Sequence, residues 1–107
     1  MTYRVLLTER ARRDLEAACT WWAQNRSHEQ AQRWYAGFAA AIRSLRQNPE
    51  RCPRAQESEA LPFELRQLNY GLGRRPTHRA VFTIREDVVA ILRVRHLAQD
   101  RLSPGNL

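Results

Sequence analysis

The residues of this chain that could do chemistry are mostly arginines. Among 107 residues, 18 are basic and 11 acidic, which gives a formal net charge of +7, and every basic residue is arginine because no lysine is present. A guanidinium stays protonated at neutral pH and binds phosphate or carboxylate through two parallel hydrogen bonds. Because the chain has no lysine, catalysis by a lysine side chain is excluded. The charge favours nucleic acid or an acidic protein as partner, although codon usage alone would give the same composition.

The cysteines and histidines form no recognisable motif. Cys19 and Cys52 belong to no Cys-x-x-Cys pair, and His28, His78 and His96 are scattered along the chain. We therefore expect no metal and no cofactor. His96 is the one candidate acid/base group, because an ordinary imidazole pKa of about 6.5 suits proton transfer. Its parity with Leu92 and Val94 in the preceding strand points instead to a half-buried residue at the rim of the core.

The N-terminal half predicts a short strand followed by two helices. Alternating side chains indicate a strand over 2–7, and Thr8 is a suitable N-cap for a helix over 9–25. A capping box that begins at Ser27 starts a second helix over 28–47. We expect an antiparallel hairpin whose interior is filled by aromatic residues, Tyr35 among them. The apolar stripes are Ala11, Leu15, Ala18 and Trp22 in the first helix, and Ala31, Trp34 or Tyr35, Phe38, Ala41 or Ile42, and Leu45 in the second.

The C-terminal half predicts strands after a proline-rich loop. Pro49, Pro53 and Pro62 exclude regular structure from the loop over 49–62. Segments rich in β-branched residues predict the strands. These strands lie over 63–70, 78–85 and 88–95, with a tight turn at Glu86–Asp87 and a frayed polar tail over 103–107.

The predicted order is β-α-α-β-β-β, within a single domain over 1–102. The apolar stripes of the helices need a large apolar surface, and one face of the sheet supplies it. We therefore expect an α+β, two-layer fold in which a helical hairpin packs on one face of a mostly antiparallel sheet. The sequence has neither a run of apolar residues long enough to span a membrane nor an apolar N-terminal leader, so we expect a cytoplasmic protein.

Strand alternation divides the C-terminal side chains between the two faces of the sheet. One face collects Ala80, Phe82, Ile84, Val88, Ala90, Leu92 and Val94, which we expect beneath the helices. The other face collects Arg79, Val81, Thr83, Val89, Ile91, Arg93 and Arg95. We expect this second face to be open and to bind an anion, either nucleic acid or an acidic peptide, with simple solvation as the alternative. The candidate binding residues are Arg66, Arg74, Arg75, Arg79, Arg93 and Arg95.

Short motifs along the chain resemble those of the RelE/ParE toxin superfamily. The resemblance runs from about residue 3 to 101, and each motif is weak alone but specific in this order. The motifs are Tyr3-Arg4-Val5-Leu6-Leu7-Thr8 with Ala11-x-x-Asp14-Leu15, Ile42-x-x-Leu45-x-x-x-Pro49, Leu65-Arg66-x-Leu68, His78-Arg79-Ala80-Val81-Phe82, and Val89-x-Ile91-Leu92-Arg93-Val94-x-His96-x-x-x-Asp100.

This resemblance implies the toxin of a type II toxin–antitoxin pair, of the plasmid-stabilisation type. Such a toxin is neutralised by a cognate antitoxin, whose acidic segment would suit the basic surface, and the two form a hetero-oligomer. RelE-like members cut mRNA on the ribosome with basic residues and often a tyrosine around the scissile phosphate. ParE-like members lack this set and act on DNA gyrase.

The C-terminal residues favour the ParE-like branch. Arg79 matches an arginine that is common to both branches, but no tyrosine follows His96 and no lysine is available. We therefore expect a gyrase inhibitor rather than an enzyme. In the alternative, RelE-like reading, Arg79 and His96 would be catalytic in an mRNA endoribonuclease. A second alternative is an inactive module that binds an antitoxin and nothing else.

Overall fold

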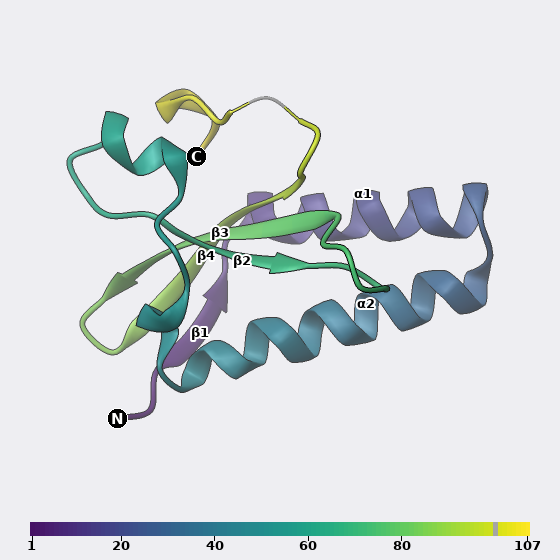
Figure 1. Cartoon of the computed structure of the whole chain (residues 1–107), viewed down its shortest axis with the longest axis horizontal. Helices are drawn as coiled ribbons and strands as arrows, with labels where there is room; N and C mark the ends of the chain where they lie inside the picture. Colours follow the sequence, from purple (N-terminus) through teal and green to yellow (C-terminus); the bar gives the residue numbers. More distant parts are fainter. Residues whose placement is uncertain (100) are drawn as a thin grey trace.

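The computed structural model describes residues 1–99 and 101–107 and has the predicted element order. Figure 1 shows two long helices packed as a hairpin against one sheet. The strands follow the order β1-β4-β3-β2, with β1 parallel to β4 and the other neighbours antiparallel. The α+β, two-layer prediction is therefore confirmed. The elements are β1 (Arg4–Leu7), α1 (Glu9–Asn25), α2 (His28–Arg43), β2 (Arg66–Tyr70), β3 (His78–Arg85) and β4 (Val88–His96).

Side-chain caps start both helices where the sequence predicts them. The Thr8 hydroxyl accepts a hydrogen bond from the Ala11 N–H, and the Ser27 hydroxyl accepts one from the Gln30 N–H. Helix α2 ends at Arg43, earlier than expected, and a 3₁₀ turn over Ser44–Arg46 continues the chain. These caps satisfy amides that have no partner inside the helix, which fixes where each helix enters the fold.

The core between the hairpin and the sheet contains the predicted stripes with one exception. Trp34 and Phe38 are fully buried, and Trp22 stacks on Trp34 with ring centroids 6.5 Å apart. Tyr35 was predicted as an interior residue, and this is wrong because its side chain is 45% exposed. Positions 34 and 35 lie about 100° apart on a helix, so only one of them can face the core. The stripe residues buried in this core are Ala11, Leu15, Ala31, Trp34, Phe38, Ile42 and Leu45.

A β-bulge in β4 reverses the side-chain alternation that the sequence predicts. Val81 pairs with Arg93 and Phe82 pairs with Ile91, so Leu92 is the extra residue. An inserted residue shifts the two-residue period by one, which exchanges the faces on one side of the bulge. The predicted faces are therefore wrong for Val88, Val89, Ala90, Ile91 and Leu92, and correct for Arg93, Val94 and Arg95.

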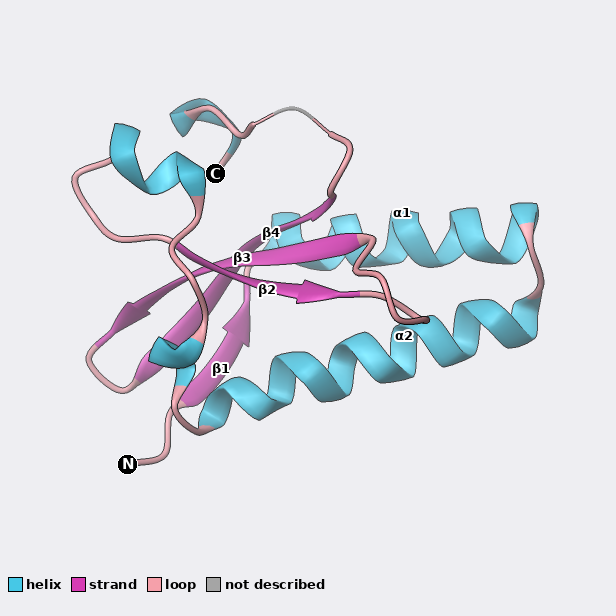
Figure 2. Ribbon diagram, in the orientation of Figure 1, coloured by secondary structure: helices cyan, strands magenta, loops and turns pink. Residues whose placement is uncertain are grey.

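The second face of the sheet is not open as predicted, because the loop and the tail cover part of it. Leu65 and Val81 are fully buried there in a second apolar cluster that includes Ala55 and Leu102. The loop contains 3₁₀ turns, one of them over Gln56–Ala60. Figure 2 shows this turn close to the short helical turn of the tail.

The ends of the strands and the C-terminal tail also differ from expectation. Strand β1 starts at Arg4 rather than residue 2, β2 at Arg66 rather than 63, and β4 extends to His96. The tail is not frayed, because the Arg10 guanidinium donates to the Gly105 and Leu107 carbonyl groups. Asp100, the last residue of the family-like motif, lies outside the described residues. None of the helices in the described ranges has the length and apolar character to cross a bilayer.

Candidate functional site

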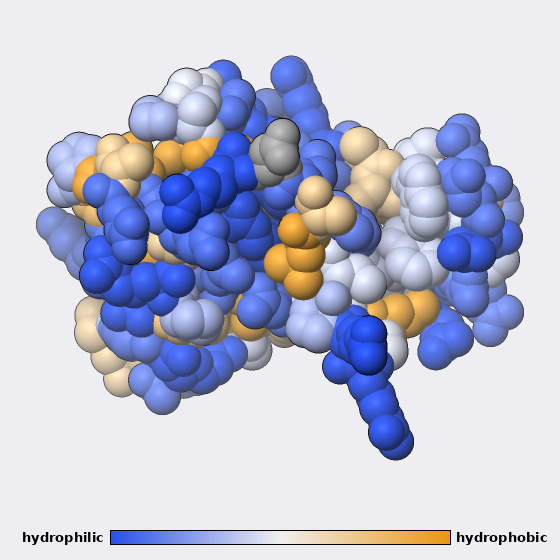
Figure 3. Space-filling model, turned by 45° about the horizontal axis from the view of Figure 1, so that its top comes forward, coloured by the Kyte–Doolittle hydropathy of each residue, from blue (hydrophilic) through white to orange (hydrophobic). Residues whose placement is uncertain are grey.

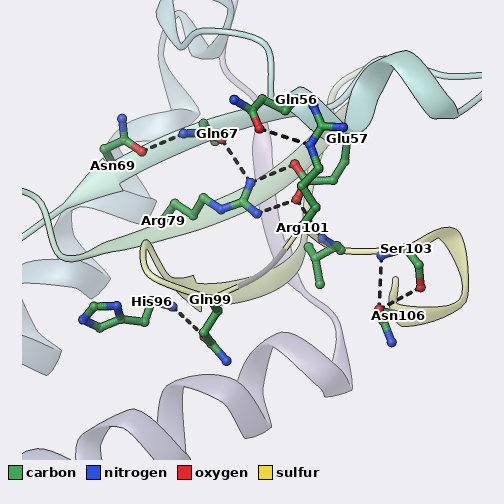
Figure 4. Close-up of polar contacts among 11 residues, drawn as sticks. Gln56, Glu57, Gln67, Asn69, Arg79, His96, Gln99, Arg101, Ser103 and Asn106 are labelled. Atoms are coloured by element: carbon green, nitrogen blue, oxygen red, sulfur yellow. Dashed lines mark hydrogen bonds and ion pairs between the residues drawn. The ribbon is translucent and has the colours of Figure 1, made fainter.

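Arg79, the central candidate residue, lies on the second face of the sheet in a buried ion pair with Glu57. Its Nη1 lies 2.9 Å from Glu57 Oε1, and its Nη2 lies 2.5 Å from Oε2. Nη1 also donates to the Gln67 side-chain oxygen at 3.1 Å. Figure 4 shows the guanidinium pointing at the carboxylate. Arg79 and Glu57 are 8% and 4% exposed, so the guanidinium binds a carboxylate in the interior of its own chain.

Glu57 also holds the C-terminal segment. Its Oε2 accepts the Leu102 N–H at 2.9 Å, and the neighbouring Gln56 side chain accepts from Arg101. The Arg79 hydrogen bonds lower the Glu57 pKa from 4.5 to about 2, against the opposing effect of desolvation. The carboxylate is therefore charged at all ordinary pH values and neutralises Arg79.

Arg93 forms a second ion pair, with Asp14 of helix α1. Arg93 Nε lies 2.7 Å from Asp14 Oδ2 and Nη2 lies 3.0 Å from Oδ1, so the contact has two prongs. Asp14 Oδ2 also accepts the Val94 N–H, which points to the edge of β4 beyond the end of β1. The hydrogen bonds from Arg93 to the Asp14 carboxylate raise the Arg93 pKa above its ordinary value. Asp14 thus closes a sheet edge that would otherwise present an unpaired amide.

Arg66 does not join the other candidate arginines. It pairs with Phe82 across the sheet, on the face that Leu68 and Tyr70 turn toward the helices. Its guanidinium contacts Glu64 at 2.9 Å and donates to the Glu50 and Cys52 carbonyl groups. Arg66 therefore ties the loop to β2.

The loop between β2 and β3 presents the exposed candidates. Arg74 and Arg75 are both exposed in this loop, whereas Arg95 is half-buried on the second face opposite Arg79. The loop begins at Gly71, where a Cβ atom would lie 2.1 Å from the Arg75 carbonyl oxygen. Glycine is required at this close approach, which brings the ends of the loop together. Arg74 and Arg75 are thus held out from the sheet on a closed loop.

His96 lies on the opposite face of the sheet from Arg79. His96 pairs with His78, and Arg79 pairs with Arg95 at the next position along β3 and β4. Side chains of consecutive pairs point to opposite faces of a sheet, so the two candidate catalytic residues face away from each other. His96 is exposed, not half-buried as its strand position suggested, and its Nδ1 accepts the Ala98 N–H at 3.0 Å. The structure therefore does not bring Arg79 and His96 together.

His78 is a buried neighbour of His96. The two rings meet edge to face with centroids 5.0 Å apart, and Trp34 contacts the His78 ring from the core at 4.9 Å. Burial lowers the His78 pKa to about 4, and the His96 ring adds to this effect. His78 is therefore neutral at physiological pH and acts as an aromatic core residue.

No metal site is evident among the side chains that the structure describes. Within residues 1–99 and 101–107, no three His, Cys, Asp or Glu residues gather into a group that could hold an ion. Cys52 is buried in the helix-side core, and burial raises the pKa of its thiol. Cys19 is only half-buried, but it packs against the same core. Both cysteines fill space in the described structure.

The surface has two hollows near the candidate residues. A shallow one of about 350 Å³ lies over Arg79 and is bordered by Arg54 and Arg101. A groove of about 550 Å³ runs between helix α1 and the edge of β4. Its lining includes Trp21, Arg95 and His96. Of the candidate arginines, Arg79 borders the first hollow, and Arg93 and Arg95 border the groove. The remaining three border neither, so the six do not form one surface.

Comparison with known proteins identifies the family. Residues 5–101 match the family model for the ParE toxin of the type II toxin–antitoxin system, parDE. The chain belongs to the ParE toxin family. This ParE-family chain has no significant match among curated proteins. It is a type II toxin–antitoxin toxin by family, as its sequence motifs suggested.

Three solved structures that share this fold come from toxin–antitoxin systems. The chromosomal ParDE system of P. aeruginosa superposes on this ParE-family chain with a TM-score of 0.72 and 21% identity, over 89% of this chain and 96% of the other. The RelBE2 toxin–antitoxin complex of Mycobacterium tuberculosis gives 0.50 and 25%, over 92% and 95%. The archaeal RelE–RelB complex of Pyrococcus horikoshii OT3 gives 0.53 and 17%, over 94% and 100%.

Sequence reasoning missed the acidic partners of the candidate arginines. Glu57 lies in a loop that was expected to be irregular, 22 positions from Arg79, and no local pattern marks it as a partner. Asp14 belongs to a family-like motif, yet nothing in the motif indicates a contact with Arg93. Trp21 could have been found, because a large apolar side chain outside the apolar stripe of its helix is expected to face solvent, and the structure leaves it 50% exposed.

Proposed function

We propose that this ParE-family toxin inhibits DNA gyrase and is not a nuclease. RNA cleavage by attack of a 2′-hydroxyl needs a base, an acid and a free cation around one phosphate. The observation that carries the proposal is the separation of Arg79 from His96 on opposite faces of the sheet. In addition, Glu57 neutralises Arg79, so this guanidinium would have to give up a buried partner before it bound a phosphate.

We further propose that the exposed loop arginines contact the target. Arg74 and Arg75 are the candidate arginines that are exposed and lie on a protruding loop, so a partner can reach both without any rearrangement. Arg66 and Arg93 already bind carboxylates of this chain, which supports a stabilising role for them rather than a contact with the target. Arg95, at the groove, is a candidate for contact with the antitoxin.

The test uses purified protein and DNA gyrase. The wild-type chain should block negative supercoiling of a plasmid, and charge reversal of Arg74 and Arg75 to Glu should weaken this inhibition at least about tenfold if both make charged contacts. Arg12→Glu is the control for each single reversal, because Arg12 is exposed on helix α1 and far from the loop in sequence. If supercoiling is unaffected across a wide range of protein concentrations, gyrase is not the target.

An mRNA endoribonuclease remains the second candidate. It is favoured by the fold shared with RelE–RelB and RelBE2 complexes and by the hollow over Arg79, which Arg54 and Arg101 border. Primer extension on mRNA from arrested cells separates the two candidates. Cuts within translated codons that disappear in Arg79→Ala would support the nuclease, whereas intact transcripts during growth arrest would exclude it.

We propose a cytoplasmic toxin–antitoxin hetero-oligomer, in which an acidic antitoxin segment binds this basic chain. The charge of +7 and the toxin–antitoxin complexes formed by the structural relatives support this partner. Growth arrest on induction, relieved by co-expression of a small reading frame found next to this gene, would confirm the pair. Harmless expression without any antitoxin would instead indicate an inactive binding module.

A further inference from the structure

The loop between β2 and β3 is closed at its base and anchored to the core. The Thr77 N–H donates to the Tyr70 carbonyl oxygen at 2.9 Å, and an added Cβ atom at Gly71 would lie 2.1 Å from the Arg75 carbonyl oxygen. Leu72 packs against the core between the helices and the sheet. Because the ends of the loop are joined and Leu72 is held by the core, the exposed side chains of the loop extend from a well-defined backbone.

Helix α2 places a third arginine near the start of this loop. An added Cβ atom at Gly37 of α2 would lie 1.9 Å from the Tyr70 hydroxyl oxygen, so the helix contacts the last residue of β2. Arg33 precedes Gly37 by one helical turn on the same face, and Figure 1 shows the loop beside α2. Burial raises the Tyr70 pKa above its ordinary value, and the charge of Arg33 opposes this rise, so the guanidinium lies near enough to act on that hydroxyl. We call Arg33, Arg74 and Arg75 the loop patch.

The charges of the loop patch are not neutralised within the part of the chain that the structure describes. All three side chains are exposed, and none of them forms an ion pair with a described carboxylate. The segment 65–85 contains no acidic residue, and helix α2 contains one, Glu29, a turn before Arg33. The loop patch therefore differs from Arg79 and Arg93, each of which binds a carboxylate of this chain. Its three guanidinium groups are available to an anion without any rearrangement.

The loop patch has no apolar anchor of the kind that protein interfaces are built on. Protein interfaces have aromatic or aliphatic side chains at their centre and charged groups at their rim. The large apolar side chains that the described structure exposes are Met1, Leu6, Trp21, Tyr35 and Leu97, and none of them belongs to the loop. Tyr35 is two positions from Arg33, which turns it by about 200° around the helix and points it away. Figure 3 shows a mostly hydrophilic surface from which strongly hydrophilic side chains project. Exposed guanidinium groups without an anchor suit a phosphate backbone better than a protein surface.

We propose that the loop patch binds the phosphate backbone of duplex DNA without reading its base sequence. Each guanidinium can donate two hydrogen bonds to one phosphate, so three of them can hold neighbouring phosphates. A duplex carries one negative charge per about 1.7 Å of its axis, which makes it a denser array of anions than a single strand. An added Cβ atom at Gly73 would meet nothing within 4 Å, so the loop backbone is also open to a ligand. The inference rests on the proposed function, since it assigns the contact of the loop arginines to the DNA that gyrase holds.

The first experiment measures DNA binding by the purified full chain without gyrase. The probe is a fluorescein-labelled duplex of about 20 base pairs, and its anisotropy is followed from about 25 to 200 mM NaCl. Each phosphate contact contributes about 0.9 to the slope of log K against log salt. Arg33→Gln, Arg74→Gln and Arg75→Gln should therefore each reduce the slope by about 0.9, and the triple variant should reduce it by about 2.7. The reduction should be the same for duplexes of different base sequence.

A matched control separates the loop patch from the general charge of the chain. Arg12, Arg43 and Arg46 are exposed and lie outside the loop, so their triple replacement by Gln removes the same charge elsewhere. This control should reduce the slope by less than about 0.9, the value of one phosphate contact. Circular dichroism establishes that each variant is folded. The proposal is overturned if the patch and control triples reduce the slope equally, or if poly-glutamate or single-stranded RNA of the same charge displaces the chain at lower concentration than the duplex does.

A supercoiling assay with the same variants separates this inference from the proposed function. The patch triple should lose both the DNA slope and the inhibition of gyrase, while the control triple keeps both. If the wild type blocks supercoiling but the patch triple binds DNA with the wild-type slope, the DNA inference fails and the proposed function stands. If the wild type leaves supercoiling unaffected but the patch triple alone loses slope, the proposed function fails and the phosphate-binding surface stands.

Discussion

Replacement of Glu57 by Gln tests whether the buried Arg79 pair stabilises the fold. The fall of the Glu57 pKa from 4.5 to about 2 corresponds to about 3 kcal/mol, because one pKa unit equals about 1.4 kcal/mol. Glutamine keeps the shape and one acceptor but removes the charge and turns an amide N–H group toward the guanidinium. Since the removal of one partner of a buried ion pair costs about 3–5 kcal/mol, we expect a loss of about 3 kcal/mol near pH 7.

The direction of the Glu57 pKa shift determines how this stabilisation changes with pH. The pKa of Glu57 is lower in the folded state, so its contribution is complete above the unfolded pKa of 4.5 and is lost as pH falls toward about 2. Urea unfolding followed by circular dichroism should therefore show a difference of about 3 kcal/mol between wild type and Glu57→Gln near pH 7 that shrinks toward zero as pH approaches about 2.

Glu59→Gln is the matched control for this measurement, because Glu59 is exposed in the same 3₁₀ turn as Glu57. Its unfolding free energy should change by less than about 0.5 kcal/mol. A loss below about 1 kcal/mol in Glu57→Gln, or a loss that is independent of pH, would refute the claim that Arg79 is held by a charged buried partner. If Glu57→Gln does not fold, the loss of wild-type unfolding free energy between pH 4.5 and about 2 tests the same claim.

Three further predictions concern contacts around the core. Asp14→Asn should lower the unfolding free energy by about 1–2 kcal/mol, because it removes the charge that faces Arg93 but keeps an acceptor for the β4 edge. Gly37→Ala should destabilise the fold by about 1–3 kcal/mol, because its Cβ would lie 1.9 Å from the Tyr70 hydroxyl oxygen, and Tyr70→Phe in the same chain should recover part of this loss. The His78 imidazole should titrate by NMR near pH 4, and stability should fall between pH 6.5 and about 4 because the unfolded state binds that proton more readily; a His78 titration near 6.5 would contradict its burial.

The parts of the fold that the sequence predicts correctly depend on local signals. Thr8 and Ser27 cap their helices through their own hydroxyl groups, and Trp34 and Phe38 lie one turn apart on a single stripe. Such signals extend over a few neighbouring residues, so they can be recognised without knowledge of the tertiary structure. The same is true of the β3–β4 hairpin, whose turn places Glu86 at a φ of 55°.

The parts that the sequence does not predict depend on distant residues. The bulge at Leu92 changes which residues of β4 face the helices, yet no glycine, proline or other local signal in the strand sequence marks it. Glu57 reaches Arg79 from a loop that local rules describe only as irregular. Trp21 and His96 come together at one groove because β1 ends early, which is a property of the sheet and not of either segment.

The arginine-only composition acquires a physical meaning from these contacts. Arg79 and Arg93 each use two nitrogens on two oxygens of one carboxylate, which the compact ammonium group of lysine cannot reproduce. Both are removed from the set of cations that a partner can meet, so the net charge overstates the binding surface. Arg74 and Arg75 on the loop and Arg26 at the groove remain exposed. At these two pairs, the two-pronged geometry therefore calls for a guanidinium rather than an ammonium group.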